Sequence, residues 1–204
     1  MTPSLPITPP HVMVGDITND GISDTIYLAA GCYWGTQKYV QENFQKLYPH
    51  TIKSVRVGLM HPNETEVKKG VPSDTKVCTG STGYIEAVQI IFKDPSPKLF
   101  EDLIKYFFQF HDPTTKDRQG YHVGTQYGSH IFVTDEAQKI IACKVLDKVK
   151  LLVKTGKIRA FKSTTVHTCV HESTTFHEAQ KNYEKNASDY CSHFIRFHVW
   201  PNSS

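Results

Sequence analysis

Apolar and polar residues follow a regular pattern from residue 25 onward, and the period of that pattern changes several times along the chain. Runs of apolar residues, or apolar residues alternating with polar ones, predict strands over 25–30, 52–57, 86–92 and 128–133, with a last strand near 164–171. Apolar residues at helical spacing predict helices from close to Cys32 through Phe44, over 99–111, over 135–153 with Thr134 as N-cap, and over 175–186. The polar segments 61–81 and 114–124 are predicted as loops.

Strands and helices therefore alternate along the chain. This order predicts an α+β fold, a two-layer sandwich in which helices cover a mixed sheet with a ferredoxin-like core. Residues 1–22 contain four prolines and no usable period, and they are predicted to be a flexible tail. Residues 23–204 are predicted to form a single domain, since a chain of 204 residues is long enough for one core.

Charge and cysteine content exclude several classes of protein. The chain has 23 Lys and Arg against 20 Asp and Glu, a formal net charge of +3, and its basic residues are dispersed, so a nucleic-acid partner is not expected. The apolar runs are too short for a membrane span and no signal-peptide pattern opens the chain, so a cytoplasmic protein is expected. The 5 cysteines lack any CxxC spacing, which argues against a disulfide scaffold or a structural zinc site.

The sharpest candidate chemistry lies between the first predicted strand and helix, in the segment Gly31-Cys32-Tyr33-Trp34-Gly35. A thiol at a helix N-terminus lies next to unpaired N–H groups and the positive end of the helix dipole, which lower its pKa and favour the thiolate. The flanking glycines let another molecule approach the sulfur, and Tyr33 and Trp34 would supply an apolar wall. The motif alone fits a buried cysteine in a tight turn equally well.

This segment resembles the GCFWG signature of the A class of peptide methionine sulfoxide reductases. The similarity continues in order and covers about residues 25–191. It passes through VCTGSTGYIEAV at 77–88, HDPTT at 111–115, RQG at 118–120 and GTQY at 124–127. Four motifs in the right order identify the chain as a member of that family, although each alone is a modest signal.

The resemblance implies a role for four residues. Cys32 would attack the sulfoxide sulfur as a thiolate, Glu86 would donate a proton to the sulfoxide oxygen, and Tyr127 would donate a hydrogen bond to that oxygen. The resulting sulfenic acid would condense with Cys191, the expected resolving thiol. From the residues alone, Glu86 also fits a solvated carboxylate, Tyr127 a core aromatic and Cys191 an exposed tail thiol.

The family's chemistry also implies the substrate and the reductant. The substrate would be methionine S-sulfoxide, free or peptide-bound, and recycling would need thioredoxin or another dithiol rather than a bound cofactor. We expect a monomer that acts under oxidative stress, with methionine sulfoxide and a thioredoxin-like donor as partners.

The sequence departs from the family pattern around the expected substrate pocket. Asp74 stands where the family usually has a second tyrosine, and His122 where it has an aspartate before GTQY. Gly128 replaces an arginine and Tyr33 the phenylalanine of the signature. The candidate substrate-binding residues are therefore Tyr33, Trp34, Asp74 and His122. Loss of a phenol at position 74 would reduce stabilisation of the transition state by roughly a few kcal/mol.

Other metal-capable and thiol residues are given structural interpretations. His167, Cys169 and His171 are spaced by two and so lie on one face of a predicted strand, but a fourth ligand is not evident and no metal site is predicted. Cys78 and Cys143 are predicted to be small core residues, since both have apolar neighbours.

Two further functions remain open from the residues alone. In the first, Cys32 adds reversibly to an electrophilic small molecule while Glu86 with Asp74 or His122 moves protons, which would make the chain an isomerase or lyase. In the second, the chain is a non-catalytic thiol sensor or binding module that keeps the fold.

Overall fold

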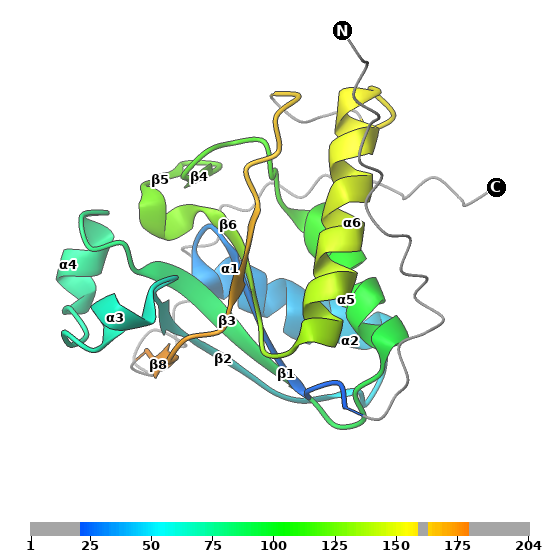
Figure 1. Ribbon diagram of the computed structural model, residues 1–204, viewed down its shortest axis with the longest axis horizontal. Helices are drawn as coiled ribbons and strands as arrows, with labels where there is room; N and C mark the ends of the chain where they lie inside the picture. The colour runs from blue at the N-terminus through cyan, green and yellow to red at the C-terminus, as the bar shows by residue number, and fades with distance from the viewer. Residues whose placement is uncertain (1–20, 159–162, 180–204) are drawn as a thin grey trace, which may run out of the picture.

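One mixed sheet forms the centre of the molecule (Figure 1). The computed structural model describes residues 21–158 and 163–179. The strand order is β7-β6-β1-β3-β2-β8, with β6 and β7 parallel and the other neighbours antiparallel. The strands are β1 (Thr25–Ala30), β2 (Ile52–Met60), β3 (Ile85–Phe92), β6 (Ser129–Val133), β7 (Cys169–Glu172) and β8 (His177–Glu178).

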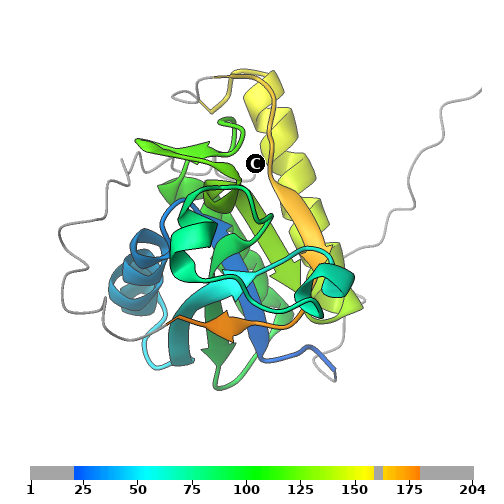
Figure 2. The same ribbon diagram turned by 90° about the vertical axis from the view of Figure 1, so that its left-hand side faces the viewer.

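The long helices pack on one face of this sheet, as Figures 1 and 2 show. They are α5 (Pro97–Phe110), α6 (Glu136–Lys154) and a continuous helical stretch of α1 (Tyr33–Lys38), the π-helical segment η2 (Tyr39–Phe44) and α2 (Gln45–Leu47). The central strands run β6-β1-β3-β2, with one helical element after β1 and another after β3. This is the βαββαβ arrangement of a ferredoxin-like core, and it confirms the predicted fold class.

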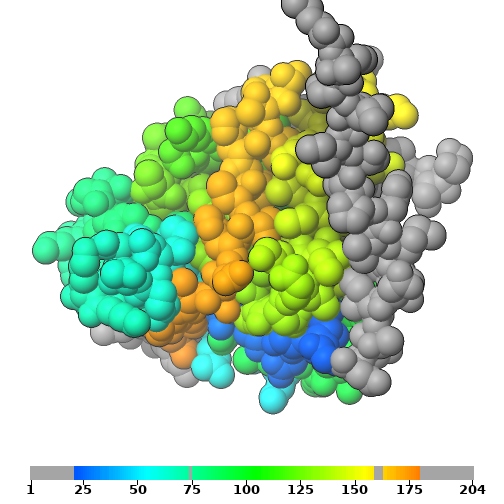
Figure 3. Space-filling model, in the orientation of Figure 1, coloured from blue at the N-terminus to red at the C-terminus, as the bar shows by residue number. Residues whose placement is uncertain are grey.

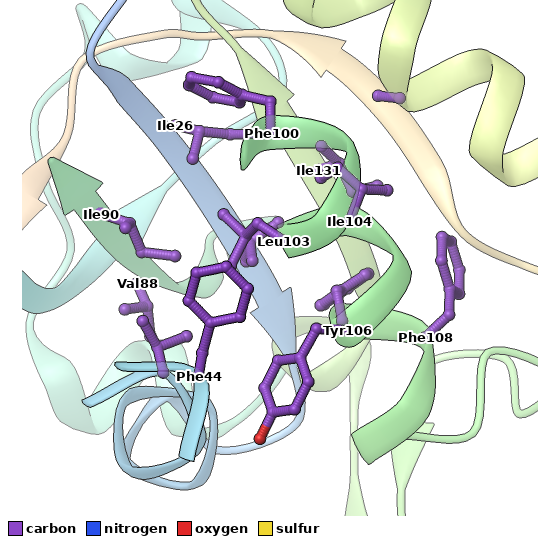
Figure 4. Packing of buried hydrophobic residues seen from close by; sticks show 14 of the residues in the cluster. Ile26, Phe44, Val88, Ile90, Phe100, Leu103, Ile104, Tyr106, Phe108 and Ile131 are labelled. Atoms are coloured by element: carbon purple, nitrogen blue, oxygen red, sulfur yellow. The ribbon is translucent and has the colours of Figure 1, made fainter. Parts of the chain in front are cut away.

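The core between the layers follows from the alternation of side chains along each strand. Ile26, Val88, Ile90 and Ile131 point toward the helices, where they meet the aromatic residues of α5 (Figure 4). Phe44 from η2 closes the same cluster at less than 2% exposure. Four phenylalanines of these two elements are buried to the same extent, namely Phe44, Phe100, Phe107 and Phe110, which makes α5 and η2 the main anchors of the helical layer, and so of α1.

The opposite face of the sheet has a smaller apolar cluster. Tyr27, Met60 and Phe132 belong to it, and Phe176 packs against them. A Cβ atom on Gly58 would lie 2.4 Å from the carbonyl oxygen of His177, so glycine at this position lets β8 approach β2. Figure 3 shows the segment 163–179 lying across this side of the molecule beside α6.

Several predicted boundaries and loops differ from the structure. The segment 61–81 contains α3 (Glu64–Val67) and α4 (Asp74–Cys78), and 114–124 contains the hairpin of β4 (Arg118–Gln119) and β5 (His122–Val123), followed by the 3₁₀ helix η3 (Thr125–Tyr127). These elements are two to five residues long, too short for a visible sequence period. Ile22, assigned to the tail by sequence, is 7% exposed and packs in the core.

Two local predictions were wrong. The N-cap of α6 is Asp135 rather than Thr134, because the Asp135 Oδ1 accepts a hydrogen bond from the backbone N–H of Gln138 at 2.7 Å. The predicted helix over 175–186 is extended where the structure describes it, since His177 and Glu178 pair with β2 as β8. Pairing with a sheet edge overrides the local helical pattern.

Two cysteines predicted to lie in the core do not. Cys78, at the end of α4, and Cys143, on α6, are both exposed. Each follows an apolar residue in sequence, Val77 or Ala142, but in a helix the neighbouring positions point to other faces.

Candidate active site

The predicted nucleophile lies where β1 ends and α1 begins. Gly31 has a φ of 72°, a left-handed conformation that favours glycine, and this bend turns the chain from the sheet into the helix. Cys32 follows as the N-cap residue of α1, and its carbonyl accepts a hydrogen bond from the N–H of Gly35 at 3.1 Å. The Cys32 side chain is 8% exposed. The thiol is therefore held at the first turn of a helix, as the sequence predicts.

Glu86 lies beside this junction, on β3. The antiparallel pairing of Leu28 with Val88 places the start of β3 next to the end of β1. The carboxylate Oε2 of Glu86 accepts a hydrogen bond from the backbone N–H of Tyr33 at 3.0 Å. Glu86 is only 7% exposed, so the interpretation as a solvated carboxylate was wrong. The carboxyl group is fixed against the residue that follows the thiol.

Tyr127 closes a third side of the site. It is the last residue of η3, and its carbonyl accepts a hydrogen bond from the N–H of Gly31 at 3.2 Å. Burial raises the pKa of the Tyr127 phenol to about 12, with further contributions from the nearby Glu86, Cys78 and Cys32. A phenol with this pKa stays protonated at neutral pH, so Tyr127 remains a hydrogen-bond donor next to a carboxyl and a thiol.

Gln126 anchors η3, and the sequence analysis assigned it no role. Its Nε2 donates a hydrogen bond to the carbonyl of Cys78 at 3.0 Å, and the Thr125 hydroxyl donates one to the carbonyl of Gly80 at 2.8 Å. Gln126 is 1% exposed, which is rare for a glutamine. A Cβ on Gly124 would lie 2.3 Å from the Gln126 Oε1, so glycine makes room for this amide. The GTQY motif was the available signal, but burial of its glutamine was not readable from sequence.

The structure brings most of the predicted substrate-binding residues to this junction. The Tyr33 ring is half-buried and lies 5.8 Å from that of Trp34, between centroids, whereas Trp34 is 4% exposed and belongs to the core. The His122 ring lies 5.0 Å from that of Tyr127, and burial lowers the pKa of His122. Asp74 is the first residue of α4. Cys191 lies outside the described residues.

The residues placed at this junction offer the Cys32 thiol, the Glu86 carboxyl and the Tyr127 phenol rather than a set of metal ligands. Within the described ranges, the one group of His, Cys, Asp or Glu side chains close enough together to hold a metal ion is His130, Cys169 and His171. That group lies on β6 and β7 and includes none of the residues placed at the β1–α1 junction. A buried thiol beside a carboxyl and a neutral phenol fits attack on a polarised atom, followed by proton donation.

Comparison with known proteins identifies the family of this chain. Residues 24–199 match the family model described as peptide methionine sulfoxide reductase. The chain belongs to this family.

Relatives and solved structures agree with the family assignment. A peptide methionine sulfoxide reductase MsrA from Methanococcus maripaludis is 33% identical over 80% of this chain and 90% of its own length. A probable peptide methionine sulfoxide reductase from Schizosaccharomyces pombe is 31% identical over 85% of this chain and 96% of its own. The crystal structure of reduced Mxr1 from Saccharomyces cerevisiae is similar with a TM-score of 0.65 and 30% identity, covering 86% of this chain and 93% of that one.

Membership in the peptide methionine sulfoxide reductase family confirms an oxidoreductase that carries out thiol-dependent methionine sulfoxide reduction. None of these comparisons favours the isomerase or lyase alternative. Among the helices that the structure describes, none is long and apolar enough to cross a membrane.

Proposed function

We propose that Cys32 is the nucleophile that reduces methionine S-sulfoxide, free or in a peptide, and that Glu86 and Tyr127 activate the sulfoxide oxygen. The observation that carries this assignment is the hydrogen bond from the Tyr33 N–H to Glu86, which fixes a buried carboxyl next to the thiol. Family membership supplies the reaction class, and this contact supports the roles proposed for Cys32 and Glu86.

The reaction balances with these three groups. The Cys32 thiolate attacks the sulfoxide sulfur while the protonated Glu86 gives its proton to the sulfoxide oxygen, and Tyr127 donates a hydrogen bond to the same oxygen. Transfer of the protonated oxygen to the Cys32 sulfur then breaks both the S–O bond of the substrate and the bond that the attack formed between the two sulfur atoms. It releases methionine and leaves Cys32 as a sulfenic acid, oxidised by two electrons.

A second thiol and a dithiol complete the proposed cycle. Cys191 condenses with the sulfenic acid, which releases water and forms a disulfide. Thioredoxin or another dithiol then reduces that disulfide by exchange, so the enzyme needs no bound cofactor. The protein would act as a monomer, since a single copy supplies all of these groups.

The substrate-binding proposals follow the walls of the junction. Tyr33, half-buried at the start of α1, and Trp34 below it would contact the methyl group beside the sulfoxide. The His122 ring lies beside the Tyr127 ring, tilted by 51°, and would border the oxygen side of the substrate. Asp74 is the fourth proposed contact, from the N-terminal end of α4.

The test measures methionine released from methionine S-sulfoxide with dithiothreitol as the reductant. The wild-type chain should turn over, and Cys32→Ser should lose at least about 10³-fold in kcat/KM, because a hydroxyl replaces the nucleophile. Cys143→Ser is the matched control, since Cys143 is an exposed thiol on α6, and it should keep wild-type turnover.

Two further outcomes sharpen the result. Cys191→Ser should keep turnover with dithiothreitol but lose it with thioredoxin, because dithiothreitol reduces a sulfenic acid directly. Release of methionine by Cys32→Ser at the wild-type rate would contradict the assignment of the nucleophile.

A further inference from the structure

Two imidazoles and a thiol meet on the face of the sheet opposite the long helices. His130 on β6 is the register partner of Cys169 on parallel β7, and His171 follows Cys169 by two residues on the same face. One ligand atom from each of the three side chains lies within 4.8 Å of the others. Two neighbouring strands and their register therefore create this group, which is called the β6–β7 triad below.

The geometry of the triad is close to that of a metal site. The Nδ1 of His130 lies 3.1 Å from the Nε2 of His171, and two imidazole nitrogens bound to one tetrahedral zinc ion lie about 3.3 Å apart. Cys169 is exposed, and its Sγ donates a weak hydrogen bond to the carbonyl of His167 at 3.6 Å. The sulfur lies within 4.8 Å of a ligand nitrogen of each histidine.

Packing holds both imidazoles in place. The His171 ring lies 5.1 Å from Phe132 and 5.3 Å from His130, between centroids. A Cβ on Gly128 would lie 2.5 Å from the His130 Nε2, so the glycine at this position makes room for the ring. Preorganised side chains lose little entropy when an ion binds.

We propose that His130, Cys169 and His171 bind one zinc ion, with a water molecule in the fourth position. Two imidazoles and a thiolate are ligands that suit zinc, and a set without carboxylates does not suit calcium or magnesium. Binding releases the thiol proton of Cys169. In the metal-free protein one of the two facing ring nitrogens carries a proton. When zinc binds, that proton moves to the other nitrogen of the same ring, so the ion is bound by one thiolate and two neutral imidazoles.

The ion would fasten the edge strand β7 to β6. The structure describes four residues in β7 and pairs that strand with β6 alone. Thr168 lies just before β7, and Ser129 lies just before His130 on β6. The hydroxyl groups of these two residues are 2.7 Å apart. A zinc ion bridging the strands adds a cross-link that the unfolded chain lacks, so zinc should raise the unfolding temperature.

The test uses the full-length chain, reduced and metal-free, and titrates it with zinc in competition with a chromophoric chelator. The wild type should bind one zinc ion per chain, tightly enough to remove that ion from the chelator. Cys169→Ser and His171→Asn should each weaken that binding at least tenfold. Cys143→Ser and His167→Gln are the matched controls, and both should bind as the wild type does.

Cobalt gives a readout that depends on the ligands themselves. Cobalt(II) bound to the wild type should show a thiolate-to-metal charge-transfer band and the strong visible bands of a tetrahedral ion. Cys169→Ser should lose the first, and Cys143→Ser should keep both. Cys169 is exposed, so its serine variant keeps the fold. Absence of stoichiometric zinc binding, or equal affinity in the wild type and Cys169→Ser, would overturn the proposal.

Discussion

Cys32 and Cys169 show how one side chain acquires two different chemistries in the same sheet. Cys32 is 8% exposed at the start of a helix, with Glu86 bonded to the next backbone N–H and the protonated Tyr127 nearby. Cys169 is exposed on an edge strand, across from one histidine and two residues before another. In the functions proposed above, the first surroundings would supply a proton and a hydrogen-bond donor, whereas the second would supply two more metal ligands.

The difference teaches that the neighbours of a thiol decide its chemistry more than the thiol's own position in sequence. A carboxyl and a phenol stabilise charge that develops on a substrate oxygen, and they offer a metal ion little. Two imidazoles ligate a soft cation, and neither is placed to protonate a sulfoxide at the β1–α1 junction. Exchanging or removing these neighbours should therefore change one site and leave the other intact.

The largest expected effect comes from removing the acid beside Cys32. Glu86→Gln keeps an oxygen that accepts the hydrogen bond from Tyr33 but lacks the transferable proton. We expect kcat/KM for methionine S-sulfoxide to fall about 10³-fold, with the circular dichroism spectrum unchanged. Glu136→Gln, at an exposed position on α6, is the control and should keep full activity. An active Glu86→Gln enzyme would assign the proton to another group.

Removing the Tyr127 phenol should lower kcat/KM by less than removing the Glu86 acid does. Tyr127→Phe keeps the ring against His122 but cannot donate a hydrogen bond to the sulfoxide oxygen. A loss of about 10²-fold in kcat/KM is expected, mostly in kcat, because the bond strengthens as charge develops on that oxygen. Tyr121→Phe removes a phenol that is 76% exposed and should behave as the wild type does. Equal losses in both variants would contradict a role specific to Tyr127.

Replacing Gln126, which anchors η3, should have an intermediate effect on stability and activity. Gln126→Leu removes the hydrogen bond from this buried amide to the Cys78 carbonyl and leaves that carbonyl without its side-chain donor. The free energy of unfolding should drop by about 1–3 kcal/mol in urea titrations, and kcat/KM should fall because Tyr127 is less well held. The zinc affinity of the β6–β7 triad should stay unchanged. A change in zinc affinity without a change in kcat/KM would show that η3 supports the β6–β7 triad rather than the β1–α1 junction.

The pKa of Tyr127 predicts a smaller effect at alkaline pH. The phenol titrates at about 12 in the folded protein and at about 10 when unfolded, so the unfolded chain releases a proton that the folded chain keeps. The stability that this residue contributes is present below pH 10 and is lost as the pH rises from 10 to 12. Tyr127→Phe should therefore lose less stability over this range than the wild type. Superimposable stability curves would contradict the raised pKa.

The smallest effect is expected at the second thiol. Cys169→Ser in metal-free buffer should keep kcat/KM within about twofold and stability within about 0.5 kcal/mol, because exposed side chains contribute little to either. The same variant should lose zinc binding. A large loss of reductase activity in this variant would mean that the two thiols are not independent.

Particular elements show why some features were predictable from sequence. The strands β1 and β3 and the helices α5 and α6 have periods long enough to identify, and they lie within a few residues of their predicted bounds. The short helices α3 and α4 and the β4–β5 hairpin have no period of their own, and their positions depend on contacts with η3 and the sheet. The extended segment at His177 and Glu178 depends on an open edge of β2, which local sequence does not encode.

The amino-acid sequence by itself determined the fold class and the family of this protein, and it pointed to Cys32 as the proposed nucleophile. Those features rest on local signals, namely the alternation of apolar residues, the glycines around Cys32 and four motifs in order. Only the tertiary structure placed the Glu86 carboxyl against the Tyr33 N–H, and only the register of β6 and β7 joined His130 to Cys169 and His171. Such contacts depend on which strands pair and with what offset, and that choice is made by the packing of the whole core.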